Sequence, residues 1–381
     1  MRIGIDAREL LGRPTGVGRY LAELLRHWSR PSSGVVGTHD LLLYCPAPLP
    51  PAVTSAFAAL QVAVRVVPGG GGTWWEQVSL PAALGGDRLD VFFAPAYTAP
   101  LRLNCPVVVT IHDLSFFAHP EWFSPREGLR RRMVTTWSAR RAALILTDSL
   151  FSQIEVERHL GLSGPRTRVI LLGATVPACL ADTRPDPGLE VGRTDSNSKP
   201  LREPVVLYVG SLFNRRRLPD LIASFPFVIA GVPDARLEII GENRTLPYQD
   251  LSALIRQSGL EDRIGLSAYV SDDALARAYS RASVFVFLSE YEGFGLTPLE
   301  ALACGIPVVL LDTPVAREVC GPAALYVGPD DPHAIAAAIM SLLRDSHARR
   351  AILRAAPDVL SRYSWARAAR MTMDALESVG R

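Results

Sequence analysis

The sequence predicts an α/β protein made of two doubly wound, Rossmann-like domains that face each other across a cleft. First, 381 residues with 48% hydrophobic content suffice for two hydrophobic cores, because one domain usually comprises roughly 100 to 200 residues. Second, short β-branched runs alternate with longer helical patterns, which is typical of parallel sheets covered by helices. Third, both halves open with a strand that runs into a loop and a helix, as in RIGIDAR…TGVGRYLAELL and VVLYVGSLFNRRRLPDLI. Ligands of such folds bind at the carboxyl ends of the strands.

Individual elements follow from the same alternation of patterns. We expect strands at Arg2–Ile5, Leu41–Tyr44, Val91–Ala94, Val107–His112 and Leu144–Thr147, and then at Val205–Gly210, Leu237–Gly241, Val284–Leu288 and Pro307–Leu311. Helical patterns lie between them, for example at Gly18–Trp28, Phe151–Leu160, Asp273–Ser280 and His333–Asp345.

The boundary between the halves is marked by a change of composition. From Ala181 to Pro204 the apolar periodicity stops, and Pro, Gly, Ser and charged residues dominate. We therefore predict an N-terminal domain over 1–182, a linker or exposed loop over 183–203, and a C-terminal domain over 204–363. A last helix over 364–381 is expected to pack back on the N-terminal domain.

Composition excludes several classes of protein. A net charge of +2 and the lack of a recognisable DNA- or RNA-binding motif argue against nucleic acid as a partner. Lys199 is the only lysine, so 39 of the 40 basic residues are arginines. Five scattered cysteines without a CxxC pair predict neither a disulfide framework nor a zinc site. The first residues lack an apolar signal-peptide core, and no apolar run approaches the roughly 20 residues of a membrane span, so we expect a cytoplasmic protein.

The most specific motif is EYEGFGLTPLE, which starts at Glu290 directly after an apolar strand. Thr297 suits an N-cap and Pro298 the first helical position, so the glycines lie where a strand meets a helix N-terminus. Backbone N–H groups there can approach a diphosphate closely. An alternative stays open, because Thr297-x-x-Glu300 is also a capping box, in which Glu300 merely caps its own helix. The residues expected to bind the diphosphate here are Gly293, Phe294, Gly295 and Leu296.

The pair Glu292 and Glu300 resembles the paired-glutamate motif of family 4 of the retaining glycosyltransferases. The resemblance extends over nearly the whole chain: GIDARELLGRPTGVGRY is similar to the family's glycine loop, IHDLSFFAHPEWF to its His-Asp segment, TDSLFSQIEV to the strand and helix that follow, and YVGSLFNRRRLPDLI to its basic donor loop. It implies the GT-B fold, an acceptor bound mainly by the N-terminal half and a nucleotide sugar bound by the C-terminal half.

The chemistry of the donor site agrees with the resemblance. Negative charge develops on the departing nucleotide diphosphate, and the sequence has no Asp-x-Asp pair that could hold a metal ion to neutralise it. Arg215 and Arg216 are the remaining candidates, beside Gly210 and Ser211 of the same donor loop. The family usually has Lys where this chain has Arg216, which puts the phosphate contact in doubt. A solvated basic loop is the alternative, since the sequence shows no acidic partner near these arginines.

Further roles come from the resemblance. His112 ends a buried strand and would lie beside the donor sugar, holding a hydroxyl or presenting its backbone carbonyl. Glu292 would bind sugar hydroxyls, and Glu300 the ribose hydroxyls. Gly16 and Gly18 would let the first helix approach the phosphates or the acceptor, although alone they fit a helix-capping turn equally well.

Retention of anomeric configuration requires a double displacement or a same-face route. No carboxylate in the matched motifs is an obvious nucleophile, so the resemblance implies the same-face route, in which the leaving phosphate acts as the base. The first candidate donor is GDP-mannose, because TGVGRY and HDLSFFAHPEWF resemble the mannosyl- and rhamnosyltransferases of polysaccharide assembly. We expect a glycan, a lipid-linked molecule or a small molecule as the acceptor.

Residues 122–141 combine aromatic side chains with arginines, which suits a peripheral contact with the inner face of a membrane. A solvated helix face in an arginine-rich protein is the alternative, and the sequence favours it. Two other functions stay open: a non-catalytic sugar- or nucleotide-binding scaffold, and a nucleotide-sugar epimerase of the same fold. A dehydrogenase is disfavoured by the incomplete glycine fingerprint, and a pyridoxal-dependent phosphorylase by the single lysine in the linker.

Overall fold

The computed structural model describes residues 1–12, 16–60, 62–174 and 203–380. The chain divides into two compact units: unit 1 comprises Met1–Gly173 with Tyr363–Arg381, and unit 2 comprises Ala174–Arg362. Each unit is described by itself, and the cleft expected between the domains stays a prediction. The predicted linker, 183–203, lies outside the described residues except for Glu203.

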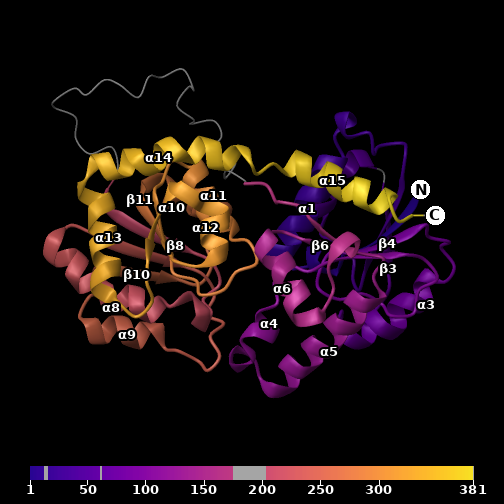
Figure 1. Ribbon diagram of the computed structural model, residues 1–381, viewed down its shortest axis with the longest axis horizontal. Coiled ribbons are helices and arrows are strands. Elements are labelled where there is room, and N and C mark those ends of the chain that lie inside the picture. The colour runs from indigo at the N-terminus through magenta and orange to yellow at the C-terminus, as the bar shows by residue number, and fades with distance from the viewer. Residues whose placement is uncertain (13–15, 61, 175–202, 381) are drawn as a thin grey trace. The chain divides into compact units, whose positions relative to one another are not determined.

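Unit 1 contains a parallel sheet with helices on both faces (Figure 1). Within the described residues the sheet has seven strands in the order β3-β2-β1-β4-β5-β6-β7. The strands are β1 (Arg2–Asp6), β2 (Asp40–Cys45), β3 (Ala63–Val66), β4 (Val91–Ala94), β5 (Val107–Thr110), β6 (Leu144–Thr147) and β7 (Thr167–Val169). The α-helices are α1 (Gly16–Trp28), α2 (Pro51–Ser55), α3 (Leu80–Leu84), α4 (Ser115–Ala118), α5 (Pro125–Arg141), α6 (Leu150–Leu160) and α15 (Trp365–Glu377).

The C-terminal helix α15 belongs to unit 1 and lies beside α1 (Figure 1). The indole Nε1 of Trp28 donates a hydrogen bond of 2.8 Å to the carbonyl oxygen of Ala369. Trp28, Trp365 and Met373 are buried, so this contact adds apolar surface to the core of unit 1.

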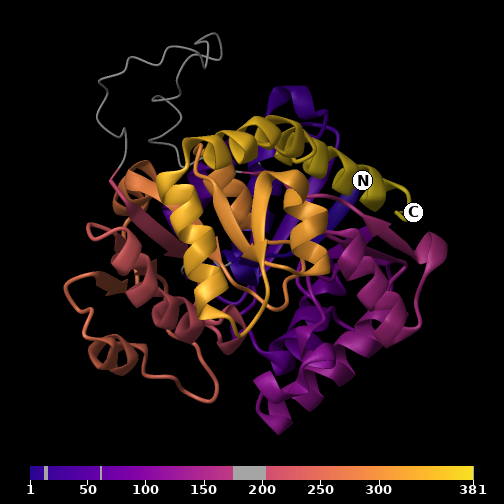
Figure 2. The same cartoon turned by 60° about the vertical axis from the view of Figure 1, so that its left-hand side comes forward.

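Unit 2 repeats the architecture with a smaller parallel sheet, and Figure 2 shows helices on both sides of its strands. Its six strands, counted over the described part of the chain, follow the order β10-β9-β8-β11-β12-β13. They are β8 (Val205–Val209), β9 (Arg236–Ile240), β10 (Ile264–Ser267), β11 (Ala282–Phe287), β12 (Val308–Leu311) and β13 (Ala324–Val327). The α-helices are α8 (Leu218–Gly231), α9 (Leu251–Ser258), α10 (Asp272–Arg281), α11 (Leu296–Ala303), α12 (Pro314–Cys320), α13 (Pro332–Arg344) and α14 (Ser346–Ser361).

The predicted strands and helices are present, with ends that differ by one or two residues, while four strands were not predicted. The unpredicted strands are β3, β7, β10 and β13. Most are short or exposed: every residue of β3 is exposed, and β7 has three residues, so neither carries a strong apolar pattern. The predicted strand Val107–His112 is too long, because β5 ends at Thr110 and His112 lies in the loop that follows.

Each sheet has one point where the strand order reverses, between β1 and β4 in unit 1 and between β8 and β11 in unit 2. The loops after two such neighbouring strands leave in opposite directions, which opens a crevice at the carboxyl edge where ligands of doubly wound folds bind. These two reversal points are the first places to look for chemistry.

Candidate active site

The reversal point of unit 2 is formed partly by the loop between β11 and α11. Gly295 has a φ of +96°, which a residue with a Cβ rarely adopts, and no atom lies within 4 Å of the position that a Cβ would take. The helix begins at Leu296 without a hydrogen bond from a capping side chain. The first N–H groups of the helix therefore have no side-chain cap, as at helix N-termini that bind anions.

The expectation that Thr297 caps this helix is wrong. Gly295 occupies the N-cap position and Pro298 is the third helical residue, because the left-handed Gly295 turns the chain into the helix two residues earlier than expected. The hydroxyl of Thr297 is buried and has no hydrogen-bond partner in the described part of the chain. A capping box with Glu300 is therefore not formed, and Glu300 lies buried within α11.

The other side of the reversal point is the basic loop after β8. It contains the short 3₁₀ helix η7 (Asn214–Arg216), and the N–H of Glu290 donates 2.9 Å to the carbonyl oxygen of Arg215, which joins the two loops. The guanidinium of Arg215 lies 4.5 Å from the ring centre of Phe213, and that of Arg216 lies 4.3 Å from the ring centre of Phe287. These aromatic contacts hold both arginines against the end of the sheet.

Both arginines reach Glu292. Arg216 Nη2 lies 3.0 Å and Arg215 Nε 3.7 Å from Oε1 of Glu292, and the hydroxyl of Ser289 donates 2.5 Å to the same oxygen. The Nε atoms of both arginines and Nη1 of Arg216 are buried without hydrogen-bond partners among the described residues. Three charged side chains thus converge with N–H groups left over, and an anionic ligand can satisfy them.

Gly210 and Ser211 form the start of the basic loop. Gly210 has a φ of +148°, and a Cβ on Gly241 would lie 1.9 Å from the carbonyl oxygen of Gly210, so the ends of β8 and β9 approach closely. Tyr208 donates 3.2 Å to the carbonyl oxygen of Ser211. Burial raises the pKa of Tyr208 to about 12, so it remains a neutral donor that fixes this turn.

An expectation about the basic loop is wrong: it has acidic neighbours. Arg217 forms ion pairs with Asp220, Glu290 and Asp330. Two of these partners could not be found from the sequence, because Glu290 and Asp330 are distant along the chain and meet Arg217 only where the loops after β8, β11 and β13 come together.

His112 lies in unit 1, just past the carboxyl end of β5, and it is buried. Its Nδ1 is 2.5 Å from Oδ2 of Asp148, and its Nε2 is 2.8 Å from the carbonyl oxygen of Pro95. Burial alone lowers the pKa of His112, but the charge of Asp148 and the hydrogen bonds outweigh it and raise this pKa above its ordinary value. A protonated ring donates to both acceptors, so no ring nitrogen is left to hold a sugar hydroxyl.

The backbone of His112 is also engaged, because its carbonyl oxygen accepts 2.9 Å from the hydroxyl of Ser152. A carbonyl oxygen has two lone pairs and can accept a second bond. Of the two roles predicted for His112, the backbone role is therefore the one compatible with these contacts, and the role itself stays a prediction.

The two glycines of the first loop lie in the first turn of α1. Gly16 is the first helical residue and is exposed, with no atom within 4 Å of where its Cβ would be, whereas Gly18 is buried. Residues 13–15 lie outside the described residues. Packing within unit 1 does not explain a glycine at position 16, and its predicted ligand-binding role stays open.

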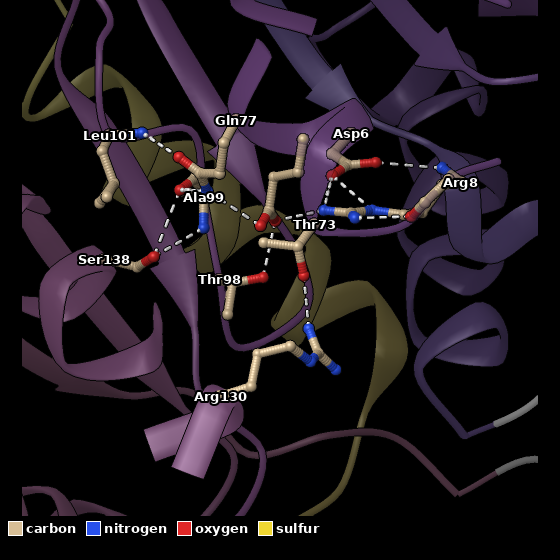
Figure 3. A network of polar contacts seen from close by, with 11 residues as sticks. Asp6, Arg8, Thr73, Gln77, Thr98, Ala99, Leu101, Arg130 and Ser138 are labelled. Carbon is tan, nitrogen blue, oxygen red and sulfur yellow. Dashed lines mark hydrogen bonds and ion pairs between the residues drawn. The ribbon is translucent and has the colours of Figure 1, made fainter. Parts of the chain in front are cut away.

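Sequence reasoning missed the charged cluster at the reversal point of unit 1 (Figure 3). Arg8, after β1, donates through Nε to Asp6 at 2.9 Å, through Nη1 to the carbonyl oxygen of Gly71 at 3.0 Å, and through Nη2 to Glu76. Thr98, after β4, donates 2.6 Å to Glu76. Burial raises the pKa of Asp6 despite the neighbouring guanidinium. The sequence Asp6-Ala-Arg8 at the end of a buried strand could have indicated this cluster.

The segment 122–141 contains α5, whose two faces differ. Gly128, Thr135 and Ser138 are buried, whereas Leu129, Met133 and Trp137 are 53%, 41% and 48% exposed. Residues four apart lie on one helix face, so these three form an apolar stripe. Exposed arginines flank it at positions 126, 130, 131, 140 and 141. Arg130 Nη1 lies 2.5 Å from the hydroxyl of Thr73 (Figure 3), next to the 75% exposed Trp74.

The described part of the chain contains no group of three or more His, Cys, Asp or Glu side chains arranged to hold a metal ion. Over the same residues, every helix is too short or too polar to cross a lipid bilayer.

The fold and the charged loops define a class of protein, the two-domain glycosyltransferases with Rossmann-like halves. Residues 193–359 match the model described as glycosyl transferases group 1, and residues 14–175 match the model of glycosyltransferase family 4. The O-antigen chain mannosyltransferase B of Escherichia coli is 30% identical over 75% of this chain and 73% of its own length. The chain belongs to glycosyltransferase family 4, and it is a glycosyltransferase.

Two further comparisons add detail. The GDP-mannose:cellobiosyl-diphosphopolyprenol alpha-mannosyltransferase of Xanthomonas oryzae pv. oryzae is 30% identical over 58% of this chain and 52% of its own length. Among solved structures, HepE from Anabaena in complex with UDP and glucose has a TM-score of 0.72 and 21% identity, covering 99% of this chain and 100% of that chain. The predicted fold class, GT-B with two Rossmann-like units, is confirmed.

Proposed function

We propose that this glycosyltransferase moves a hexose from a nucleoside diphosphate donor to an acceptor hydroxyl with retention of configuration and without a bound metal. The observation that carries the proposal is the convergence of Arg215 and Arg216 on Glu292, in the loop that leads into the uncapped helix α11, with guanidinium nitrogens that lack hydrogen-bond partners within the described residues. Such donors match a diphosphate that gains negative charge as it leaves.

The residues divide the reaction between them. Arg215 and Arg216 bind the diphosphate together with the backbone of Gly293, Phe294, Gly295 and Leu296. Glu292 accepts from sugar hydroxyls, for which its Oε2 has no protein partner within the described ranges, and Glu300 accepts from the ribose. The bond between the anomeric carbon and the diphosphate oxygen breaks, the acceptor oxygen bonds to that carbon on the same face, and the acceptor proton passes to the leaving phosphate.

GDP-mannose is the proposed donor. Relatives named as mannosyltransferases support it, one of which takes GDP-mannose by its name. UDP-glucose is the alternative to test, because HepE is a fold neighbour that binds UDP and glucose. The acceptor is proposed to be a glycan or a lipid-linked glycan.

The reaction itself is the test. The protein is incubated in EDTA with GDP-mannose or UDP-glucose and a panel of glycan and polyprenyl-linked acceptors, and the anomeric configuration of the product is read by NMR. We expect an α-linked product from the α-configured donor, formed without divalent metal. An inverted product, or transfer only after Mg²⁺ or Mn²⁺ is added, contradicts the proposed mechanism.

Two other functions are separated by the same assay. An epimerase changes the donor when no acceptor is present, so NMR of donor alone distinguishes it. A non-catalytic scaffold binds nucleotide but transfers nothing to any acceptor.

The exposed stripe of α5 is proposed to rest on an anionic membrane, where lipid-linked acceptors are found. Its apolar residues fit the acyl boundary, and the flanking arginines complement anionic headgroups. Flotation with two kinds of vesicle, anionic ones that contain phosphatidylglycerol and neutral ones of phosphatidylcholine, tests this proposal. Trp137→Ser should reduce binding to the anionic vesicles several-fold. Phe227→Ser, which changes an exposed residue of unit 2, should not. Equal binding of wild type to both kinds of vesicle, or of wild type and Trp137→Ser, contradicts the proposal.

A further inference from the structure

Arg217 differs in conformation and contacts from the two arginines before it. It precedes α8 with φ +52° and ψ +38°, a left-handed conformation that residues with a Cβ seldom adopt. Asp330, in the loop after β13, also has a positive φ, of +59°, and is an ion-pair partner of Arg217. Strained residues of this kind persist only where their surroundings hold them, and they gather at functional sites.

The guanidinium of Arg217 joins three segments of unit 2. Its Nε donates 2.6 Å to Oδ2 of Asp220, in the first turn of α8, while Nη1 donates to Glu290 and Nη2 to Asp330. The arginine side chain is 14% exposed and that of Glu290 is 31% exposed, whereas that of Asp330 is 79% exposed. The pair with Glu290 is therefore the stronger link between the loops, and the pair with Asp330 is the one most screened by water.

Glu290 lies only two residues before Glu292, in the same loop, and its N–H bonds to the carbonyl oxygen of Arg215. A carboxylate at that place competes with any anionic ligand for Arg215 and Arg216, unless another cation holds it. Arg217 holds it with a planar fork of donors. The donors of Arg215 and Arg216 are left unpartnered within the described residues, apart from the contacts with Glu292.

We propose that Arg217 is a positioning residue of the donor site, which holds Glu290 in an ion pair and so keeps this carboxylate from competing with the leaving diphosphate for Arg215 and Arg216. The proposal rests on the proposed function, because it presupposes that these arginines bind the donor. It predicts a defect in donor binding that disappears when the competing carboxylate is removed.

A double-mutant cycle of Arg217 and Glu290 tests whether Arg217 keeps this carboxylate from competing with the donor. Arg217→Asn keeps a residue that tolerates the left-handed conformation and removes all three ion pairs. It should raise the donor KM by about ten-fold and leave kcat and the acceptor KM within about three-fold, in line with typical coupling between neighbouring charges. Glu290→Gln alone should change the donor KM less than about three-fold, and the double variant should recover most of the loss. A donor KM unchanged in Arg217→Asn, or raised equally in the double variant, overturns the proposal.

Hydrogen–deuterium exchange separates this proposal from the proposed function. Without any donor, Arg217→Asn should speed exchange of the amides of residues 211–217 and 289–296, while Arg281→Ala, which removes an exposed pair with Glu238, should not. If the wild type neither binds nucleotide nor transfers sugar, the proposed function fails and the donor-site role of Arg217 fails with it, whereas unchanged exchange in both loops of an active enzyme contradicts the positioning role alone.

Discussion

Both reversal points of this protein contain charged side chains, but the two points differ in whether the buried polar atoms of these side chains have hydrogen-bond partners. In unit 1, Nε, Nη1 and Nη2 of Arg8 all have partners, and both ring nitrogens of His112 do as well. In unit 2, buried N–H donors of Arg215 and Arg216 are left over within the described residues. Buried polar groups normally find partners, so an incomplete set indicates a site that a ligand completes.

This difference helps to distinguish residues that stabilise a Rossmann-like unit from residues that bind a ligand. The crevice of unit 1 is occupied by side chains that bond to one another within the chain: Asp6, Arg8, Glu76 and Thr98 (Figure 3). Their loss should lower stability. Arg215, Arg216 and Glu292 leave the crevice of unit 2 ready for an anion, so their loss should lower donor binding and turnover.

The largest expected effect is on turnover by Arg216→Ala. Removing one charge-assisted donor to the leaving group should lower kcat/KM by about 10²–10³-fold, or about 3–4 kcal/mol. The melting temperature should change little, because the guanidinium has one ion-pair partner and several unpartnered donors. Steady-state assays of Arg216→Ala and of the control Arg281→Ala measure this loss of kcat/KM. Equal losses in both variants contradict a specific role of Arg216 in donor binding.

A smaller effect, on stability, is expected from Asp148→Asn in unit 1. Removing one member of a buried ion pair is costly, but His112 can lose its proton, so we expect about 2 kcal/mol of destabilisation below pH 6.5. The folded pKa of His112 is raised, so the stabilisation from the pair is fully present below the unfolded pKa and is lost as pH rises through the folded pKa. Urea unfolding at pH 6 and pH 9 should show a larger difference between Asp148→Asn and wild type at pH 6. A larger difference at pH 9 contradicts a charged His112.

The smallest effect is expected from Thr98→Val, which keeps the shape of the side chain and removes its hydrogen bond to Glu76. The free energy of unfolding should fall by about 1 kcal/mol, as for a typical side-chain hydrogen bond. Urea unfolding measures this loss, with Thr54→Val, which removes an exposed hydrogen bond to the carbonyl oxygen of Pro51, as the control. A change in nucleotide affinity instead of stability contradicts the assignment of this cluster to architecture.

Much of the fold was predictable because buried parallel strands are continuous apolar runs. Strands such as Val91–Ala94 and Leu144–Thr147 were predicted to the residue, whereas β3 escaped because its four residues are all exposed. The convergence of Arg215, Arg216 and Glu292 was also predictable, since the loops after neighbouring parallel strands meet at one edge.

Contacts between residues distant in sequence could not be predicted. Two partners of Arg217 come from loops distant in sequence, and nothing in Glu290 or Asp330 alone indicates that they hold an arginine. The pairing of His112 with Asp148 depends on the adjacency of β5 and β6, which the order of strands along the chain does not fix. The start of α11 was misplaced by two residues because glycine can replace a side-chain cap.

The most direct test is isothermal titration of GDP, with UDP for comparison, into wild type, Arg216→Ala and Thr98→Val in the presence of EDTA. Wild type and Thr98→Val should bind one of the two nucleotides with equal affinity, and Arg216→Ala should bind it at least about ten-fold more weakly, the loss of a charge-assisted bond. Equal affinity in all three proteins, or binding by wild type only after a divalent metal is added, contradicts the claim that Arg215 and Arg216 of unit 2 form the donor site.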